Sequence, residues 1–287
     1  MATETKSELD QLLEASFHSD VAITKLLQMM VPHSTEKIQE TVFKYFEKHL
    51  ETKNPIAQYM IGHMYYHGHH VKRNYAEALK YFTLSADQGN SSAEMNIGVM
   101  YMYGQGVVKD ERVAVKYIKN SAEKGNIDAI NNMATFYVKG WGDIKVDYDK
   151  AMNYYKLADE KGDWNAPYWI GIMHARGYGV PVNHHHAVEN YKRSAERKHT
   201  VSQTLLGIIY ENGQDVPRDV EQAIKYYKMA VGNDDGKTIT LLTKLYMKEN
   251  RREDAEKLVA TLPDNLLLKW QLNNIIKGIR YPVFAIF

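Results

Sequence analysis

A self-similarity with a period of about 36 residues extends over more than half of this chain. Small residues recur at spacings of 36, 36, 37 and 36 residues, at Ala57, Ala93, Ala129, Ala166 and Ser202. At the same offsets another column carries mainly glycine, at Gly62, Gly98, Ala134, Gly171 and Gly207. Two further columns carry mainly tyrosine, at Tyr65, Tyr101, Tyr137, His174 and Tyr210, and at Tyr81, Tyr117, Tyr154, Asn190 and Tyr226. A period of this length is typical of helical hairpins that stack side by side.

Each repeat is predicted to form two amphipathic helices, which we call helix A and helix B. Ala57, Ile61 and Tyr65 share one face of a helix A, and Ala78 and Phe82 share one face of a helix B. A glycine that can adopt positive φ is expected to end each helix A, at Gly68, Gly104, Gly140, Gly177 and Gly213. An Asn or Asp is expected to cap each helix B, at Asn74, Asp110, Asp147, Asn183 and Asp219.

The fourth repeat interrupts both tyrosine columns. His174 and Asn190 stand where the other repeats carry tyrosine. This repeat is therefore expected to bury less aromatic area than its neighbours.

The turn between the two helices resembles that of the Sel-one-like repeat family, which is related to the tetratricopeptide repeat. The residues that carry the resemblance are the Gly-x-Gly turns, at Tyr103-Gly104-Gln105-Gly106-Val107-Val108-Lys109-Asp110 and Gly177-Tyr178-Gly179-Val180-Pro181-Val182-Asn183. The resemblance implies an all-α fold, a right-handed α-solenoid of stacked antiparallel helix hairpins. It also implies a concave groove, lined by one face of the A helices, that receives a peptide or helix of another protein.

The columns predict five clear repeats, with degenerate repeats on both sides. The predicted segments are N-terminal helices with a degenerate capping repeat at 1–53, repeats at 54–89, 90–125, 126–162, 163–198 and 199–234, a degenerate tetratricopeptide-like hairpin at 235–262, and a C-terminal helix with an apolar capping tail at 263–287. The tail from Tyr281 to Phe287 has two interpretations. It either folds back over the last helices or serves as a docking peptide for another protein.

Composition excludes several classes of function. Lys and Arg number 36 and Asp and Glu number 35, so no overall positive field is available to bind nucleic acid. The chain has no cysteine, which excludes thiol chemistry. The polar N-terminus and the lack of a long apolar segment predict neither export nor membrane insertion, so an intracellular, cytoplasmic protein is expected.

Three patterns that could indicate chemistry are interpreted as structural. The histidine clusters at 67–70 and 184–186 lie in turns three repeats apart, so no metal site is expected. Gly177-Tyr178-Gly179 follows no strand and lacks a third glycine, so no nucleotide cofactor is expected. Asp143, Asp147 and Asp149 fit a turn and a helix start, and no catalytic pair is recognised.

Two surfaces are predicted to bind a partner. One surface is a stripe of side chains at positions i, i+4, i+7 and i+8 of the A helices, on the side opposite the face that packs in the hairpin. The second is an edge formed by Trp141 and Tyr178, which occupy equivalent turn positions. The predicted partner-binding residues are Tyr59, His63, Tyr66, Met95, Met102, Tyr103, Asn131, Lys139, Trp141, Tyr168, Arg176 and Tyr178. The alternatives are that neighbouring repeats partly bury the stripe and that the two rings cover their own turns.

The leading functional hypothesis is a scaffold that binds a peptide or helix of another protein and has no enzymatic activity. One alternative is an adaptor that recruits a ligase, kinase or chaperone to a client. A hydrolase is less well supported, because no residue pattern indicates one.

Overall fold

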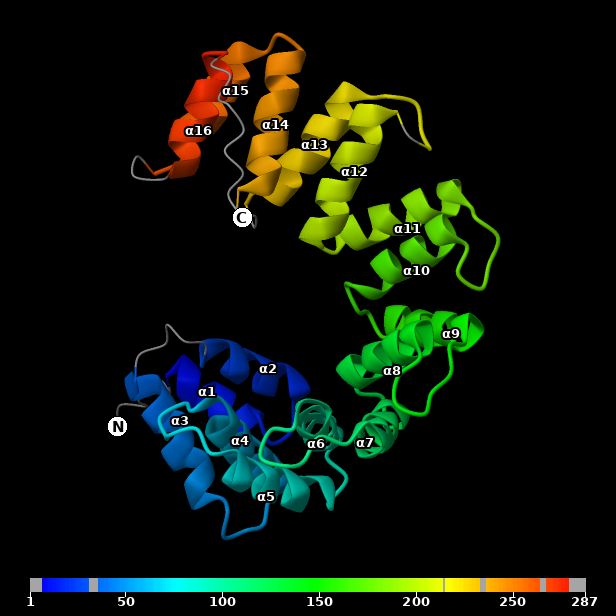
Figure 1. Ribbon diagram of the computed structural model, residues 1–287. Helices are drawn as coiled ribbons and strands as arrows, with labels where there is room; N and C mark the ends of the chain where they lie inside the picture. Colours follow the sequence, from blue (N-terminus) through cyan, green and yellow to red (C-terminus); the bar gives the residue numbers. More distant parts are fainter. Residues whose placement is uncertain (1–6, 31–35, 214, 233–235, 264–266, 279–287) are drawn as a thin grey trace. The chain divides into compact units, whose positions relative to one another are not determined.

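The computed structural model describes residues 7–30, 36–213, 215–232, 236–263 and 267–278. Within these ranges the chain forms sixteen α-helices and no strand (Figure 1). In chain order they are α1 (Glu8–Ala15), α2 (Asp20–Met29), α3 (Glu36–Lys48), α4 (Pro55–His67), α5 (Tyr75–Ala86), α6 (Ser91–Tyr103), α7 (Glu111–Glu123), α8 (Ile127–Lys139), α9 (Tyr148–Glu160), α10 (Ala166–Arg176), α11 (His184–Glu196), α12 (Thr200–Asn212), α13 (Val220–Val231), α14 (Lys237–Lys248), α15 (Arg252–Ala260) and α16 (Leu267–Ile276).

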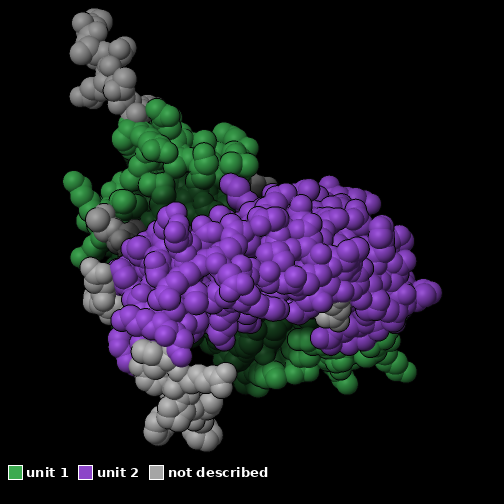
Figure 2. Space-filling view, turned by 90° about the horizontal axis from the view of Figure 1, so that it is seen from above, with its two compact units in different colours: residues 1–154 green, residues 155–287 purple. Residues whose placement is uncertain are grey.

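The chain divides into two compact units, residues 1–154 and 155–287, which Figure 2 colours separately. Within unit 1, α4 packs on α5 and α6 on α7, and α5 and α7 also contact the first helix of the next hairpin. Within unit 2, α10 packs on α11, α12 on α13 and α14 on α15, again with contacts between successive hairpins. The predicted all-α fold of stacked hairpins is therefore confirmed.

The predicted helix ends are also confirmed. All five Asn and Asp residues at the starts of the B helices accept a hydrogen bond from a first-turn backbone N–H, as in Asn74 with Ala76 N at 3.0 Å. Gly68 ends α4 with a φ of 76°, a conformation that an L side chain rarely adopts. The sequence therefore specifies each hairpin locally.

The hairpin crossing depends on glycine in the middle of helix A. A Cβ placed at Gly207 would lie 2.4 Å from two ring carbons of Tyr227, and one at Gly98 would lie 2.5 Å from Ile118 Cγ1. Such distances are far below van der Waals contact. The glycine column therefore allows helix B to place a large side chain directly against the backbone of helix A.

Tyrosine pairs from the two columns stack in four of the five repeats. Their ring centroids lie 5.7 to 6.1 Å apart, in the pairs Tyr65–Tyr81, Tyr101–Tyr117, Tyr137–Tyr154 and Tyr210–Tyr226. In the fourth repeat, His174 instead meets His186 edge-on at 5.2 Å. The Nδ1 atom of His174 is buried and has no hydrogen-bond partner among the described residues. The fourth repeat thus lacks the stacked pair that joins helix A to helix B elsewhere.

The flanking regions are helical as well. α14 and α15 pack against each other, and the short turn between them contains Asn250 with a φ of 58°. α16 lies within the predicted last helix, whereas the tail from Tyr281 to Phe287 lies outside the described residues. No helix in the described part of the chain is both long and apolar enough to cross a membrane.

A methyl group in the hairpin crossing should destabilise unit 2. Gly207→Ala forces its Cβ into the buried Tyr227 ring, so the free energy of unfolding should fall by about 1 to 3 kcal/mol. Gly232→Ala is the matched control, because Gly232 has a helical φ of −67° and nothing within 4 Å of its added Cβ. Chemical denaturation of both variants checks this, and equal stability of the two would contradict the proposed crossing.

The fourth repeat should open more readily than its neighbours. Backbone amides of residues 163–198 should exchange with solvent faster than those of residues 90–125, because the fourth repeat lacks the stacked tyrosines. The double variant His174→Tyr with Asn190→Tyr should slow exchange in residues 163–198, since an aromatic pair contributes about 0.5 to 1.5 kcal/mol. Hydrogen exchange measured by mass spectrometry tests both statements. Equal exchange in the two parent segments would show that the tyrosine pairs do not control local stability.

Candidate functional site

In each unit a pocket lies against the helices that occupy the helix A position. The first, which we call the unit 1 pocket, measures about 520 Å³ and is lined by Ile23, Thr24, Leu27, Ile56, Tyr59, Gly89, Asn90, Ser91, Ser92, Lys124, Gly125, Asn126, Ile127 and Asp128. The second, which we call the unit 2 groove, measures about 310 Å³ and is lined by Tyr168, Ile172, Thr200, Val201, Thr204, Leu205, Ile208, Lys237 and Thr238. Every helical lining residue belongs to α2, α4, α6 or α8 in unit 1, or to α10, α12 or α14 in unit 2.

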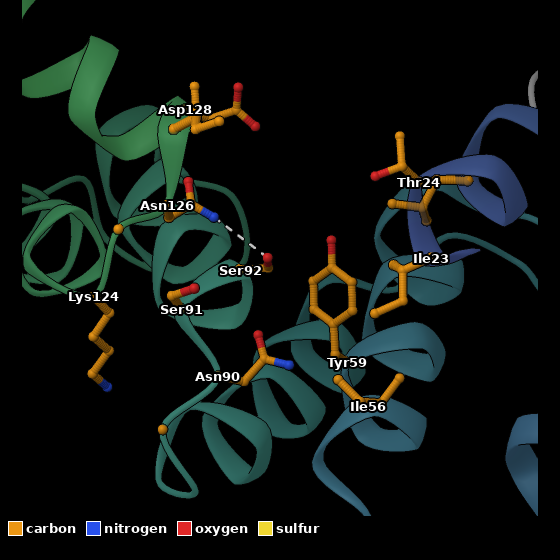
Figure 3. A pocket seen from close by; sticks show the side chains of 14 residues that line it. Ile23, Thr24, Ile56, Tyr59, Asn90, Ser91, Ser92, Lys124, Asn126 and Asp128 are labelled. Atoms are coloured by element: carbon orange, nitrogen blue, oxygen red, sulfur yellow. Dashed lines mark hydrogen bonds between the residues drawn. The ribbon is translucent and has the colours of Figure 1, made fainter. Parts of the chain in front are cut away.

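The unit 1 pocket is mainly polar. Figure 3 shows Tyr59 between the α2 side chains Ile23 and Thr24 and the α6 residue Ser92. Asn126 Nδ2 donates to Ser92 Oγ at 3.4 Å, and joins the starts of α6 and α8. Tyr59 is only 6% exposed, and burial raises the pKa of its hydroxyl to about 12, although a hydrogen bond with Asn96 opposes this shift. The Tyr59 hydroxyl is therefore neutral at physiological pH.

The unit 2 groove is mainly apolar. Ile172, Leu205 and Ile208 supply aliphatic side chains from two successive A helices. The groove also contains a polar pair, because Thr204 Oγ1 and Thr238 Oγ1 lie 2.8 Å apart and connect α12 to α14. Each of these hydroxyls thus has a hydrogen-bond partner within the protein, and the rest of the groove offers mostly apolar surface.

An aromatic cluster borders this groove. Tyr168 packs edge-on against the ring of His199 at 4.9 Å, and Trp164 lies against the same ring at 4.9 Å. His199 Nδ1 lies within hydrogen-bond distance of Ser194 Oγ and Ser202 Oγ, and burial lowers the pKa of this imidazole. The Trp164 side chain is 53% exposed. Hydrogen bonds thus hold the His199 ring in place, and the Trp164 indole that packs on it remains exposed.

Two of the predicted binding residues line these cavities, Tyr59 in unit 1 and Tyr168 in unit 2. Both come from the first half of a helix A. Met95 and Asn131 occupy the same helix A position as Tyr59 and Tyr168 but line neither cavity. The other predicted helix residues that line neither cavity come from later on the A helices: His63, Tyr66, Met102, Tyr103, Lys139 and Arg176.

In the second half of α4, Tyr66 contacts the turn of the next repeat. Its hydroxyl donates to Gln105 Oε1 at 2.5 Å, and Gln105 belongs to the turn of the next repeat. Tyr103, by contrast, is 68% exposed. Neighbouring turns therefore contact the second half of some A helices, and the cavities form nearer the helix starts.

The two predicted turn aromatics have separate surroundings. Trp141 stacks on Phe136 of α8 with ring centroids 4.5 Å apart. Tyr178 lies in the other unit, where its hydroxyl is 3.5 Å from Arg176 Nη1. That these rings form one binding edge stays a prediction.

The predicted stripe includes Ile172, Thr204 and Ile208, which line the unit 2 groove, but sequence reasoning did not select Val201, Leu205 or Trp164. Val201 and Leu205 line the groove, and Trp164 borders it. Val201 and Trp164 are each 53% exposed, and both line one pocket, so they form adjoining exposed apolar surface. A signal was available, because Trp164 follows Gly162-Asp163 where the equivalent positions after Gly89 and Gly125 carry Ser91 and Ile127.

Three histidines of unit 1 come together at the end of α4. The ring centroids of His63, His67 and His69 lie 4.3 to 6.0 Å apart. Burial lowers the pKa of His63 to about 3, with smaller effects from its two neighbours. Burial also lowers the pKa values of His67 and His69. Among the described residues, no group of three or more His, Cys, Asp or Glu side chains is arranged to hold a metal ion.

A family model described as the Sel1 repeat matches this chain five times. The matches cover residues 55–90, 91–126, 127–163, 165–199 and 200–235. No curated protein sequence matches the chain.

Solved structures share the fold. A Sel1 repeat protein from Oxalobacter formigenes is 27% identical, with a TM-score of 0.68, and the match covers 95% of this chain and 99% of that one. A protective antigen of uropathogenic Escherichia coli with an SLR fold is 21% identical, with a TM-score of 0.64 and coverage of 95% and 64%. An immunity protein of Pseudomonas aeruginosa is 15% identical, with a TM-score of 0.53 and coverage of 79% and 82%. The last two likenesses concern the fold alone.

Mild acid should destabilise the protein through His63. Because burial lowers the pKa of His63 to about 3, the unfolded chain binds this proton first as pH falls below the ordinary value of 6.5. The neutral His63 side chain therefore contributes fully to the free energy of unfolding above pH 6.5, and this contribution is lost as pH falls from there toward 3. At pH 5.5 the loss should be about 1.4 kcal/mol relative to pH 7.5.

Urea denaturation at the two pH values measures this loss. The variant His63→Leu lacks the titrating ring, so its unfolding free energy should fall less than that of the parent over the same interval. Equal losses in the parent and the variant would show that His63 is not held neutral in the folded protein.

Proposed function

The chain belongs to the Sel1 repeat family, and on that premise we propose that it is a scaffold that binds a peptide or helical segment of another protein in the unit 2 groove. Repeats of this kind generally mediate protein interactions. The proposal assigns no catalytic step to the chain, in keeping with a family that is typically not catalytic.

One observation carries the proposal, namely apolar side chains left accessible along successive A helices. Val201 is 53% exposed, and it lies in a groove whose other walls include Ile172 and Leu205. Burial of apolar surface contributes roughly 25 cal/mol per Å². An extended or helical segment that covers the groove would therefore gain free energy from contacts that the chain does not make by itself.

An adaptor remains the alternative proposal. It would hold a client in the same groove and recruit a ligase, kinase or chaperone through a second surface. The groove alone accounts for binding of one partner, so no second surface is required. The scaffold is therefore the simpler proposal.

A charge placed in the unit 2 groove should abolish partner binding without unfolding the protein. Val201→Glu places a carboxylate on an exposed position of the groove, so affinity for a groove partner should fall by about tenfold or more. Met229→Glu is the matched control, because Met229 is 38% exposed on α13, a B helix that lines neither cavity. Both variants should melt within a few degrees of the parent, because surface substitutions usually change the free energy of unfolding by about 0.5 kcal/mol or less.

The measurement begins with affinity capture from the native cells, using parent and variant proteins side by side. Proteins recovered by the parent and by Met229→Glu, but not by Val201→Glu, are then purified and their dissociation constants measured directly. Partners that bind all three proteins equally would place the binding surface outside the groove.

A further inference from the structure

The unit 2 groove continues into a second pocket beside the exposed indole. This pocket measures about 440 Å³ and is lined by Trp164, Arg197, Lys198, His199, Thr200 and Val201. Thr200 and Val201 also line the groove, so the two cavities share one wall. A single segment of a partner can therefore contact both the aliphatic groove and the face of Trp164.

The charged side chains that line these two cavities have one sign, whereas the nearby carboxylate of Asp163 accepts a hydrogen bond from Ala166 N within the protein. The described lining residues of the two cavities include the basic side chains Arg197, Lys198 and Lys237 and no acidic side chain. Arg197 is engaged within the protein, since its Nη1 donates to Asp159 Oδ1 at 2.8 Å. Lys198 is exposed and forms no ion pair among the described residues.

Asp234 and Asp235 precede Lys237 in the sequence and lie outside the described residues. We therefore place the charge complementarity on Lys198 and on the start of α12.

The start of α12 adds positive potential at the same place. Its N-cap residue, His199, makes no capping hydrogen bond with the backbone, because its Nδ1 faces Ser194 Oγ and Ser202 Oγ instead. The A helices of unit 1 differ, since Asn54, Asn90 and Asn126 all accept hydrogen bonds from first-turn N–H groups. First-turn N–H groups without a side-chain cap, at the positive end of a helix, favour an oxygen acceptor.

The unit 1 pocket provides an internal comparison. Its one basic lining residue, Lys124, pairs with Glu94 at 3.0 Å, and its lining also includes the carboxylate of Asp128. The charged side chains there carry both signs. The positive character is therefore a property of the unit 2 groove and not of the A helices in general.

We propose that the occupant of the unit 2 groove is a segment of another protein in which apolar side chains stand next to an acidic side chain. The apolar side chains pack between α10 and α12 and against Trp164. The carboxylate accepts hydrogen bonds at the start of α12 and lies near the Lys198 ammonium. A segment with basic residues at that position would be repelled. This inference rests on the proposed function and specifies the chemistry of the partner.

Selection from a library of short random peptides displayed on phage tests the proposal with no partner chosen in advance. The library is selected in parallel against the parent protein and against Val201→Gln, a neutral variant that does not itself repel acidic peptides, and peptides that only the parent enriches are groove-dependent. These peptides should combine large apolar residues with a surplus of Asp and Glu over Lys and Arg. Groove-dependent peptides with neutral or basic flanks would overturn the proposal but leave the proposed function intact. An absence of groove-dependent peptides would count against both.

The selected peptides are then synthesised with a fluorescent label, and their affinity is measured by anisotropy. Lys198→Glu should lower the affinity for the acidic peptides by about three- to tenfold, mainly because association becomes slower. The loss of affinity should be smaller at high salt. Lys228→Glu on α13 is the charge-matched control and should leave affinity unchanged. Equal affinity of the parent and Lys198→Glu at low salt would overturn the assignment of the carboxylate to this end of the groove.

Discussion

The close contact between helix A and helix B at the glycine column is the constraint on which the other features depend. At Gly171 and Gly207 a tyrosine ring of helix B lies directly against the backbone of helix A. Because these large side chains point into the hairpin, helix A turns its opposite face away from helix B. Capping residues and turn glycines fix the ends of each helix, but this contact determines how the two helices cross. The same face of each A helix is then presented along each unit.

The two units use that common geometry to offer different surfaces. In unit 1, α4, α6 and α8 begin with Asn caps, and the pocket beside them is polar and carries charges of both signs. In unit 2, α12 begins with a buried neutral His199 that bonds to serines, and the cavities beside it are apolar with basic residues at one end. The repeat therefore supplies the architecture, whereas a few departures from its consensus supply the binding chemistry.

Much of the fold was predictable because it is determined locally. The cap at Asn74 and the turn at Gly68 depend on neighbours within a few residues, and their spacing recurs five times. The site was less predictable, because it depends on contacts between repeats. Tyr66 fits the predicted stripe, yet its hydroxyl is engaged by Gln105 from the next repeat. Val201 lies one helical position before the small-residue column, outside the stripe, and nothing in its own repeat shows that it remains exposed. The meeting of His63, His67 and His69 likewise depends on side-chain positions that spacing alone does not determine.

The central claim is that the faces of α10, α12 and α14 that line the unit 2 groove receive the partner. Hydrogen exchange of the protein with and without a saturating groove-dependent peptide tests it most directly, because protection reports where the backbone is covered or stabilised. The account predicts that protection is concentrated in the first turns of α12 and α14 and in α10, with α11 and α13 little changed. Protection concentrated in α11 and α13, with none in α12, would contradict it.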